Sequence, residues 1–226
     1  MNVQCYASGS TANLYSVSDG KTEILLEAGL KYKDMLKVLP KLPTEYSACF
    51  VSHKHLDHSR GIAEIIKRGI PVYFGHDLLS INRAAIINIG SLDVKAFYVP
   101  HDVPNAGFLI RSKSDAESIV FITDAFYSPA RFAFSATIWM IESNYAKDLL
   151  APGDLLSDRL YTSHMEISQT IKTLLANDLS QTREIHLLHL SDERSDEERF
   201  VREVQAATGV PTYAAPKIKK QQSNTS

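Results

Sequence analysis

The feature that most restricts what this chain can fold into is a short segment, H-K-H-L-D-H at residues 53–58, with three histidines and an aspartate. Imidazoles are seldom packed this densely without a shared ligand, because each needs a hydrogen-bond partner once it leaves water. Alternate residues of an extended turn point the same way, so His53 and His55 are predicted to share one metal ion. Asp57 and His58 are then predicted to face a second ion. The alternative is a solvated loop with ordinary histidines.

A metal cluster needs more ligands than one loop provides, and three further candidates occur at the ends of apolar runs. His101 follows the run that ends at Val99, Asp124 follows the run that ends at Thr123, and His189 closes a run that begins at Ile185. Each run has the length and composition of a buried strand. Because side chains at the ends of several strands can converge on one edge of a sheet, the three are predicted to complete the cluster.

Short β-rich runs alternate with turns and helical patterns along the chain, which predicts a layered α/β domain. The predicted strands are Asn13–Val17, Glu23–Glu27, Ala48–Ser52, Val72–Phe74, Val94–Val99, Ala106–Arg111, Ile119–Thr123, Ile138–Glu142 and Ile185–Leu190. The predicted helices are Gly61–Arg68, Ile167–Ala176 and Asp196–Ala207. The second of these helices is expected to begin with a capping box formed by Ser163 and Glu166.

Composition sets broad limits on the class of protein. The 226 residues are 44% hydrophobic and 22% charged, which is ordinary for a globular protein and sufficient for a core without disulfides. Net charge is −2, so overall charge makes no case for nucleic acid, although a locally basic cleft would not appear in that sum. We find no signal peptide and no apolar stretch near the ~20 residues that a bilayer requires, and therefore expect a cytoplasmic protein with no membrane partner.

The ligand motif H-x-H-x-D-H, followed in order by His101, Asp124 and His189, resembles that of the metallo-β-lactamase superfamily. Three further motifs, G-S-x-x-N-x-Y at 9–15, E-S-N at 142–144 and H-L-S at 189–191, resemble its YycJ (WalJ) exonuclease-like branch. The resemblance implies a four-layer αββα sandwich with metals at one edge of the paired sheets. We expect one such domain over residues 1–216 and a disordered tail over residues 217–226.

The resemblance also implies how the ligands divide between two divalent ions per chain. His53, His55 and His101 would hold the first, Asp57, His58 and His189 the second, and Asp124 would bridge them. Imidazole and carboxylate ligands without thiolate favour zinc, with manganese or iron as alternatives. Glu27 stands where the family usually has aspartate. This position supports the metal loop (residues 53–58), so the longer side chain of Glu27 is expected to alter that support.

Asp57 and His164 are the candidate catalytic residues. His164 matches a family histidine at the start of a late helix, and we expect it to contact the scissile phosphate or protonate the leaving group. The alternative for His164 is a surface residue that caps the helix. Ser143 and Asn144 are candidate substrate contacts; the alternative for these two is a turn after a strand.

The chemistry expected is hydrolysis by a metal-bound hydroxide, because a bound divalent ion lowers the pKa of water to about 7. The first prediction is a nuclease acting on single-stranded nucleic acid, or a phosphodiesterase. A hydrolase of small phosphodiesters, or of thioesters or lactones, would use the same metals. A non-catalytic metal-binding module that contacts protein partners is the alternative of another class, and a homodimer stays open.

Overall fold

The computed structural model describes residues 1–81, 85–150 and 163–217. Its strands are β1 (Asn2–Ala7), β2 (Leu14–Ser18), β3 (Glu23–Leu26), β4 (Cys49–Val51), β5 (Val72–Phe74), β6 (Ile87–Ile89), β7 (Leu92–Val99), β8 (Asn105–Ser112), β9 (Ser118–Ile122), β10 (Ile138–Glu142), β11 (Glu184–Leu188) and β12 (Thr212–Ala214). Its α-helices are α1 (Tyr32–Val38), α2 (Leu56–Ser59), α3 (Ile62–Lys67), α4 (Gly75–Ile81), α6 (Ile167–Leu175) and α7 (Glu197–Thr208). Two 3₁₀ turns are η1 (Pro43–Glu45) and η2 (Lys147–Leu149).

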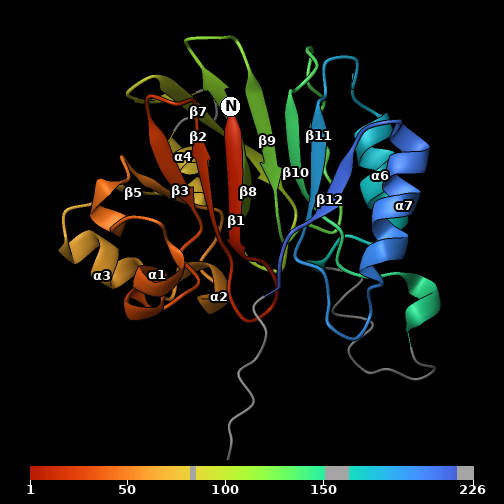
Figure 1. Ribbon diagram of the computed structural model, residues 1–226, viewed down its shortest axis with the longest axis horizontal. Helices are drawn as coiled ribbons and strands as arrows, with labels where there is room; N and C mark the ends of the chain where they lie inside the picture. Colours follow the sequence, from red (N-terminus) through yellow and green to blue (C-terminus); the bar gives the residue numbers. More distant parts are fainter. Residues whose placement is uncertain (82–84, 151–162, 218–226) are drawn as a thin grey trace, which may run out of the picture.

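The strands form two sheets that pack face to face. The smaller sheet has the order β1-β2-β3-β4-β5, and the larger has the order β12-β11-β10-β9-β8-β7-β6. Helices α1 and α3 lie at one side of the molecule and α6 and α7 at the other, so the sheets are the two inner layers of four (Figure 1). The sequence-based prediction of an αββα sandwich is confirmed.

Three clusters of buried side chains correspond to the three spaces between these layers. Between the sheets, Phe50 packs edge-on against Phe108, with ring centroids 5.6 Å apart. Met35 of α1 is buried with residues from the outer face of the smaller sheet. Phe200 of α7 and Trp139 of β10 are buried in the space outside the larger sheet. Apolar residues on both faces explain why β9 and β10 are fully buried throughout their length.

Strand direction brings the candidate ligands to one edge. Strands β3, β4 and β5 are parallel, as are β9, β10, β11 and β12, and β7 runs in the same direction as β9 because both are antiparallel to β8. The segments that follow β4, β7, β9 and β11 therefore leave the sheets at their carboxyl ends. Carboxyl ends of parallel strands are where open α/β sheets bind ligands.

The sequence patterns miss the short or polar elements β1, β6, β12, α1 and α4. Strand β1 alternates polar residues with Val3 and Cys5, and β6 and β12 have only three residues each. The expected capping box is wrong: the N-cap of α6 is Glu166, whose side chain accepts a hydrogen bond from the Ser168 amide, and not Ser163.

Lys217 is placed in the structure and donates from Nζ to the Ser191 carbonyl at 2.8 Å. The rest of the tail predicted to be disordered, residues 218–226, lies outside the described residues. Within the described ranges, no helix has the length and apolarity that crossing a membrane would require.

Gly29 allows the metal loop to lie against the strands, and we expect Gly29→Ala to lower the free energy of unfolding by about 3 kcal/mol. A Cβ at this position would lie 1.7 Å from the carbonyl oxygen of Asp57 and 2.6 Å from the amide nitrogen of Asn13. Both of these are backbone atoms, so relieving either contact would require the whole loop to shift. Urea denaturation after chelation measures the loss without a contribution from bound metal.

Gly20→Ala is the matched control for this substitution. Gly20 has φ +84° but nothing within 4 Å of an added Cβ, so only the left-handed conformation is penalised, by roughly 1–2 kcal/mol. Equal losses in the two variants would contradict the proposed clash.

Candidate metal centre

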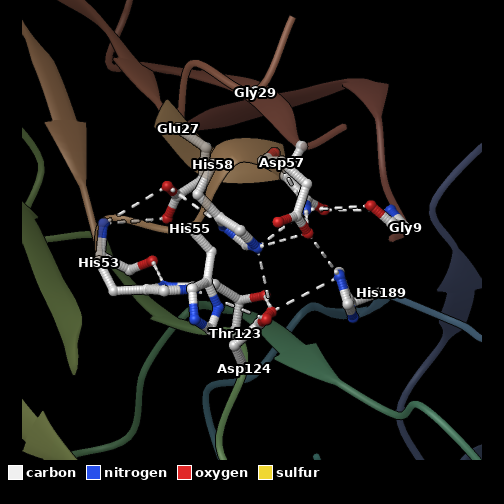
Figure 2. A network of polar contacts seen from close by, with 12 residues as sticks. Gly9, Glu27, Gly29, His53, His55, Asp57, His58, Thr123, Asp124 and His189 are labelled. Atoms are coloured by element: carbon white, nitrogen blue, oxygen red, sulfur yellow. Dashed lines mark hydrogen bonds and ion pairs between the residues drawn. The ribbon is translucent and has the colours of Figure 1, made fainter. Parts of the chain in front are cut away.

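The predicted ligands come together at the carboxyl edge of the sheets, although they span residues 53 to 189. Figure 2 shows His58, Asp57 and His189 converging on Asp124, which follows β9. The predicted ligands occupy two of the three groups of potential ligand atoms that the described residues form, and within each group all the atoms lie within 4.8 Å of one another. The first group is His53, His55, His101 and Asp124. The second is Asp57, His58, Asp124 and His189.

Asp124 belongs to both groups, and its two carboxylate oxygens face different partners. Oδ2 lies 3.8 Å from Nε2 of His53 and 3.8 Å from Nε2 of His101. Oδ1 lies 3.3 Å from Nε2 of His58 and 3.6 Å from Nε2 of His189. The Asp124 carboxylate thus presents one oxygen to each group of imidazoles.

Four of the imidazoles have a polar neighbour at the nitrogen that faces away from the cluster, an arrangement that fixes the orientation of metal-binding histidines. Nδ1 of His101 donates to the Ser163 carbonyl at 2.9 Å. The corresponding neighbours are Ser52 Oγ for His53 (2.9 Å), Glu27 Oε2 for His58 (3.3 Å) and Glu142 Oε1 for His189 (3.4 Å).

Backbone strain is concentrated at this site. Among the described residues, four that are not glycine have positive φ, and three of them, Glu27 (63°), Asp124 (49°) and His189 (53°), belong to the centre or its support. Such conformations cost of order 1–3 kcal/mol each and persist where surrounding contacts over-determine them. The strain is thus a sign of function that the sequence does not display.

The two groups differ in their electrostatics. Burial, together with neighbouring imidazoles, lowers the pKa of His53 to about 2, so this ring keeps a free lone pair. Burial also opposes protonation of His189, but the carboxylates of Asp124, Asp57 and Glu142 outweigh it and raise the pKa of that residue to about 10. The second group therefore has a strongly negative local potential, which favours a cation.

The residues present fit divalent metal ions. Nε2 of His53 is buried and has no hydrogen-bond partner among the described residues, which is costly unless a ligand completes it. The donors are imidazole nitrogens and carboxylate oxygens without a thiolate, a set that suits zinc, manganese and iron.

His164 lies beside the second group, and Glu142 at the end of β10 holds it there. Nδ1 of His164 donates to Glu142 Oε1 at 2.7 Å, and the His164 ring stacks on that of His189 with centroids 5.2 Å apart. Burial lowers the pKa of His164, but the charge of Glu142 outweighs this and raises it overall. His164 also lines a hollow of about 170 Å³ together with two lysines, Lys147 and Lys172.

Glu142→Gln tests this support, and we expect turnover to fall by about 10–100-fold, with a smaller change in KM. Oε2 of Glu142 accepts from the amides of Ala125 (2.8 Å) and Met165 (3.3 Å), so both of its oxygens are needed as acceptors. An amide group would place a donor against a donor. Steady-state kinetics measures the effect, and the control is Glu193→Gln at an exposed carboxylate. Equal turnover in the two variants would contradict the role of Glu142 in holding His164.

Ser143 and Asn144 are both buried. The side-chain amide of Asn144 donates to the His189 carbonyl at 2.6 Å, and its own backbone carbonyl accepts from the Ser191 amide at 2.9 Å. Placed this way, Asn144 holds the turn that carries His189. Contact of Ser143 and Asn144 with substrate stays a prediction.

Three further residues, Asp102, Glu142 and Asn13, contact the centre although no role there is predicted for them from the sequence. Asp102 Oδ1 lies 3.0 Å from Nε2 of His101 and 3.4 Å from Nε2 of His55. The side-chain nitrogen of Asn13 lies 3.0 Å from Nε2 of His58, and its oxygen accepts from Gly9 and Tyr15. The available signals were that Asp102 adjoins His101, that Asn13 belongs to the motif at 9–15 and that Glu142 begins the motif at 142–144.

Glu27 lies outside both groups, beneath the metal loop. Its carboxylate accepts a hydrogen bond from the Ser52 amide at 3.1 Å and reaches His58 Nδ1 at 3.3 Å. The longer glutamate side chain thus spans from the end of β4 to His58.

Solved structures of other proteins share this architecture over nearly the whole chain. The YhfI protein of Bacillus subtilis, described as a metallo-β-lactamase fold protein, superimposes with a TM-score of 0.74, 16% identity and coverage of 95% of this chain and 96% of that one. The chain has the metallo-β-lactamase fold. Short-form human tRNase Z, with a TM-score of 0.66 and 14% identity, covers 97% of this chain and 98% of its own. Yeast PDE1 superimposes with a TM-score of 0.66 and 12% identity, and the match covers 95% of this chain and 97% of PDE1.

Within the metallo-β-lactamase fold, the sequence resembles the WalJ and YycJ proteins, as its motifs predict. It is 26% identical to the exodeoxyribonuclease WalJ of Streptococcus pneumoniae over 230 residues, which cover 85% of this chain and 82% of the relative. It is 24% identical to the exodeoxyribonuclease YycJ of Bacillus anthracis, and the match covers 82% of this chain and 80% of the relative. No protein-family profile matches the chain.

Proposed function

We propose that this chain is a hydrolase with two divalent metal ions that cleaves phosphodiester bonds in single-stranded nucleic acid. The observation that carries the proposal is the placement of the Asp124 carboxylate, with one oxygen towards each group of ligands. The similarity to proteins named exodeoxyribonucleases supports a DNA strand as substrate.

In this proposal His53, His55 and His101 would hold the first ion, Asp57, His58 and His189 would hold the second, and Asp124 would be a ligand of both. Zinc suits the donors best, and manganese and iron are alternatives. Two such ions supply Lewis-acid chemistry, activating water and neutralising charge on the phosphate.

The side chains of the protein position the substrate and move protons. Glu142 fixes the ring of His164 through Nδ1, which leaves Nε2 to carry a proton to the leaving oxygen of the phosphodiester. Asp57 shapes the second group, and its Oδ2 lies 3.2 Å from Nε2 of His58 and 3.5 Å from Nε2 of His189.

Turnover of bis(p-nitrophenyl) phosphate and of a 5′-labelled single strand tests the proposal, with zinc- and manganese-loaded protein beside Asp57→Ala. We expect cleavage that needs metal and is lost in the variant. Cleavage of the small diester alone would restrict the substrate class to small phosphodiesters. Two bound ions with no cleavage of either would refute the proposal and direct tests to thioesters, lactones and a non-catalytic role.

A further inference from the structure

A second hollow, of about 480 Å³, lies outside the metal centre on the outer face of the larger sheet. Helices α6 and α7 flank the β11 and β12 side of this sheet (Figure 1), whereas the hollow lies over β7 and β8 and is closed by the loop between β9 and β10. The lining residues that give the hollow its chemistry are Asp93, Lys95, Phe97, Arg111, Arg131 and Phe132.

The floor of the hollow is aromatic. Residues 93, 95 and 97 alternate along β7 and point to one face, and Phe97 pairs with Gly107 across the strands. A Cβ on Gly107 would lie 2.4 Å from Cζ of Phe97, so the glycine is what lets this ring lie over β8. Phe132 and Phe97 pack edge to face with ring centroids 5.3 Å apart, and both residues line the hollow.

The rim of the hollow is cationic. The Arg111 guanidinium lies 4.0 Å from the centroid of the Phe134 ring, and Lys95 and Arg131 flank the same space. Throughout the described ranges, no carboxylate lies within ion-pair distance of any of these three cations. Asp93, which is acidic and also lines the hollow, is paired with Lys113 at 3.0 Å.

We propose that this hollow binds nucleotides of the single strand whose phosphodiester lies at the metal centre, an inference that rests on the proposed function. Aromatic rings that stack bases, combined with cations that contact phosphates, are the recurrent means of binding single strands without sequence preference. The local excess of positive charge contrasts with the net charge of −2 for the whole chain, so it is a property of this face.

The connectivity links the hollow to the centre. Phe97 precedes the ligand His101 by four residues, which is about 13 Å at the rise of a β-strand. The loop that supplies Arg131 and Phe132 begins directly after the ligand Asp124. The segments that line the hollow thus continue directly into the segments that carry His101 and Asp124, and the proposed strand would follow them.

The double variant Lys95→Gln, Arg111→Gln tests the inference in the metal-loaded protein. For a fifteen-nucleotide strand we expect KM to rise roughly tenfold with little change in kcat, while bis(p-nitrophenyl) phosphate, too small to reach the hollow, is turned over as before. Binding of a phosphorothioate strand, followed by anisotropy, should weaken similarly. The dependence of log K on log salt should become shallower by ~1.4, or ~0.7 for each lost phosphate contact.

The matched control is Lys67→Gln, Arg202→Gln, which makes the same change of net charge at exposed residues of α3 and α7. Equal effects in the two double variants, or no effect in either, would overturn the inference. Weaker self-association in the first variant, with unchanged strand binding, would assign the hollow to a second copy of the chain. If the wild type turns over no diester, the proposed function fails by itself, and the anisotropy and salt slope still decide whether the hollow binds a strand.

Discussion

Asp124→Asn is expected to lower phosphodiester turnover by about a thousandfold or more. That factor corresponds to ~4 kcal/mol of lost transition-state stabilisation, within the range that metal ions supply. The substitution removes the charge shared by both groups and turns one oxygen into an NH₂ group facing imidazoles. Because Oδ1 and Oδ2 face different groups, neither orientation of the amide can serve both.

Metal content distinguishes this explanation from a fault in folding. We expect less than two ions per chain in Asp124→Asn, with far-ultraviolet circular dichroism like that of the wild type. Asp77→Asn, at an exposed carboxylate of α4, should retain both metal and turnover. Full metal content together with near-normal turnover in Asp124→Asn would remove the bridging role.

His164→Ala is expected to lower cleavage of a DNA strand by about 10²–10⁴-fold, the usual contribution of general acid catalysis. The alkoxide that leaves a DNA strand is strongly basic and needs a proton. The p-nitrophenolate ion is a much weaker base and leaves without one, so bis(p-nitrophenyl) phosphate should lose far less activity. The ratio of the two losses is the measurement.

His186→Ala is the matched control, because His186 lies on β11 with its ring near Tyr213 and Glu184, outside both groups of ligands. It should change neither reaction. Equal losses on both substrates in His164→Ala would place His164 in support of the metal centre, and no loss on the strand would eliminate it as the acid.

Much of this centre can be predicted from the sequence because its ligands follow recognisable strands. The dense segment at 53–58 marks the metal loop, and His101, Asp124 and His189 each stand where an apolar run ends. The predicted αββα layers follow from the resemblance that these residues carry. By contrast, Glu142 is the last residue of a buried strand, and only the parallel pairing of β10 with β11 brings it beside His189.

The remaining features depend on tertiary contacts that leave no local pattern. The positive φ values of Asp124 and His189 occur in the loops that follow β9 and β11, and no local sequence pattern marks them. The aromatic hollow requires Gly107 opposite Phe97, a cross-strand relation fixed by the register of β7 and β8. The expected capping box at Ser163 fails because a matching spacing does not determine where the first helical turn begins.

Return of metal to the chelated protein, followed by cleavage of a 5′-labelled single strand, measures how many metal ions cleavage requires. We expect negligible cleavage without metal, and a rise that reaches its plateau at two equivalents of zinc or manganese per chain. Two tightly bound equivalents without cleavage of the strand, or a plateau at one equivalent, would contradict a paired-metal phosphodiesterase.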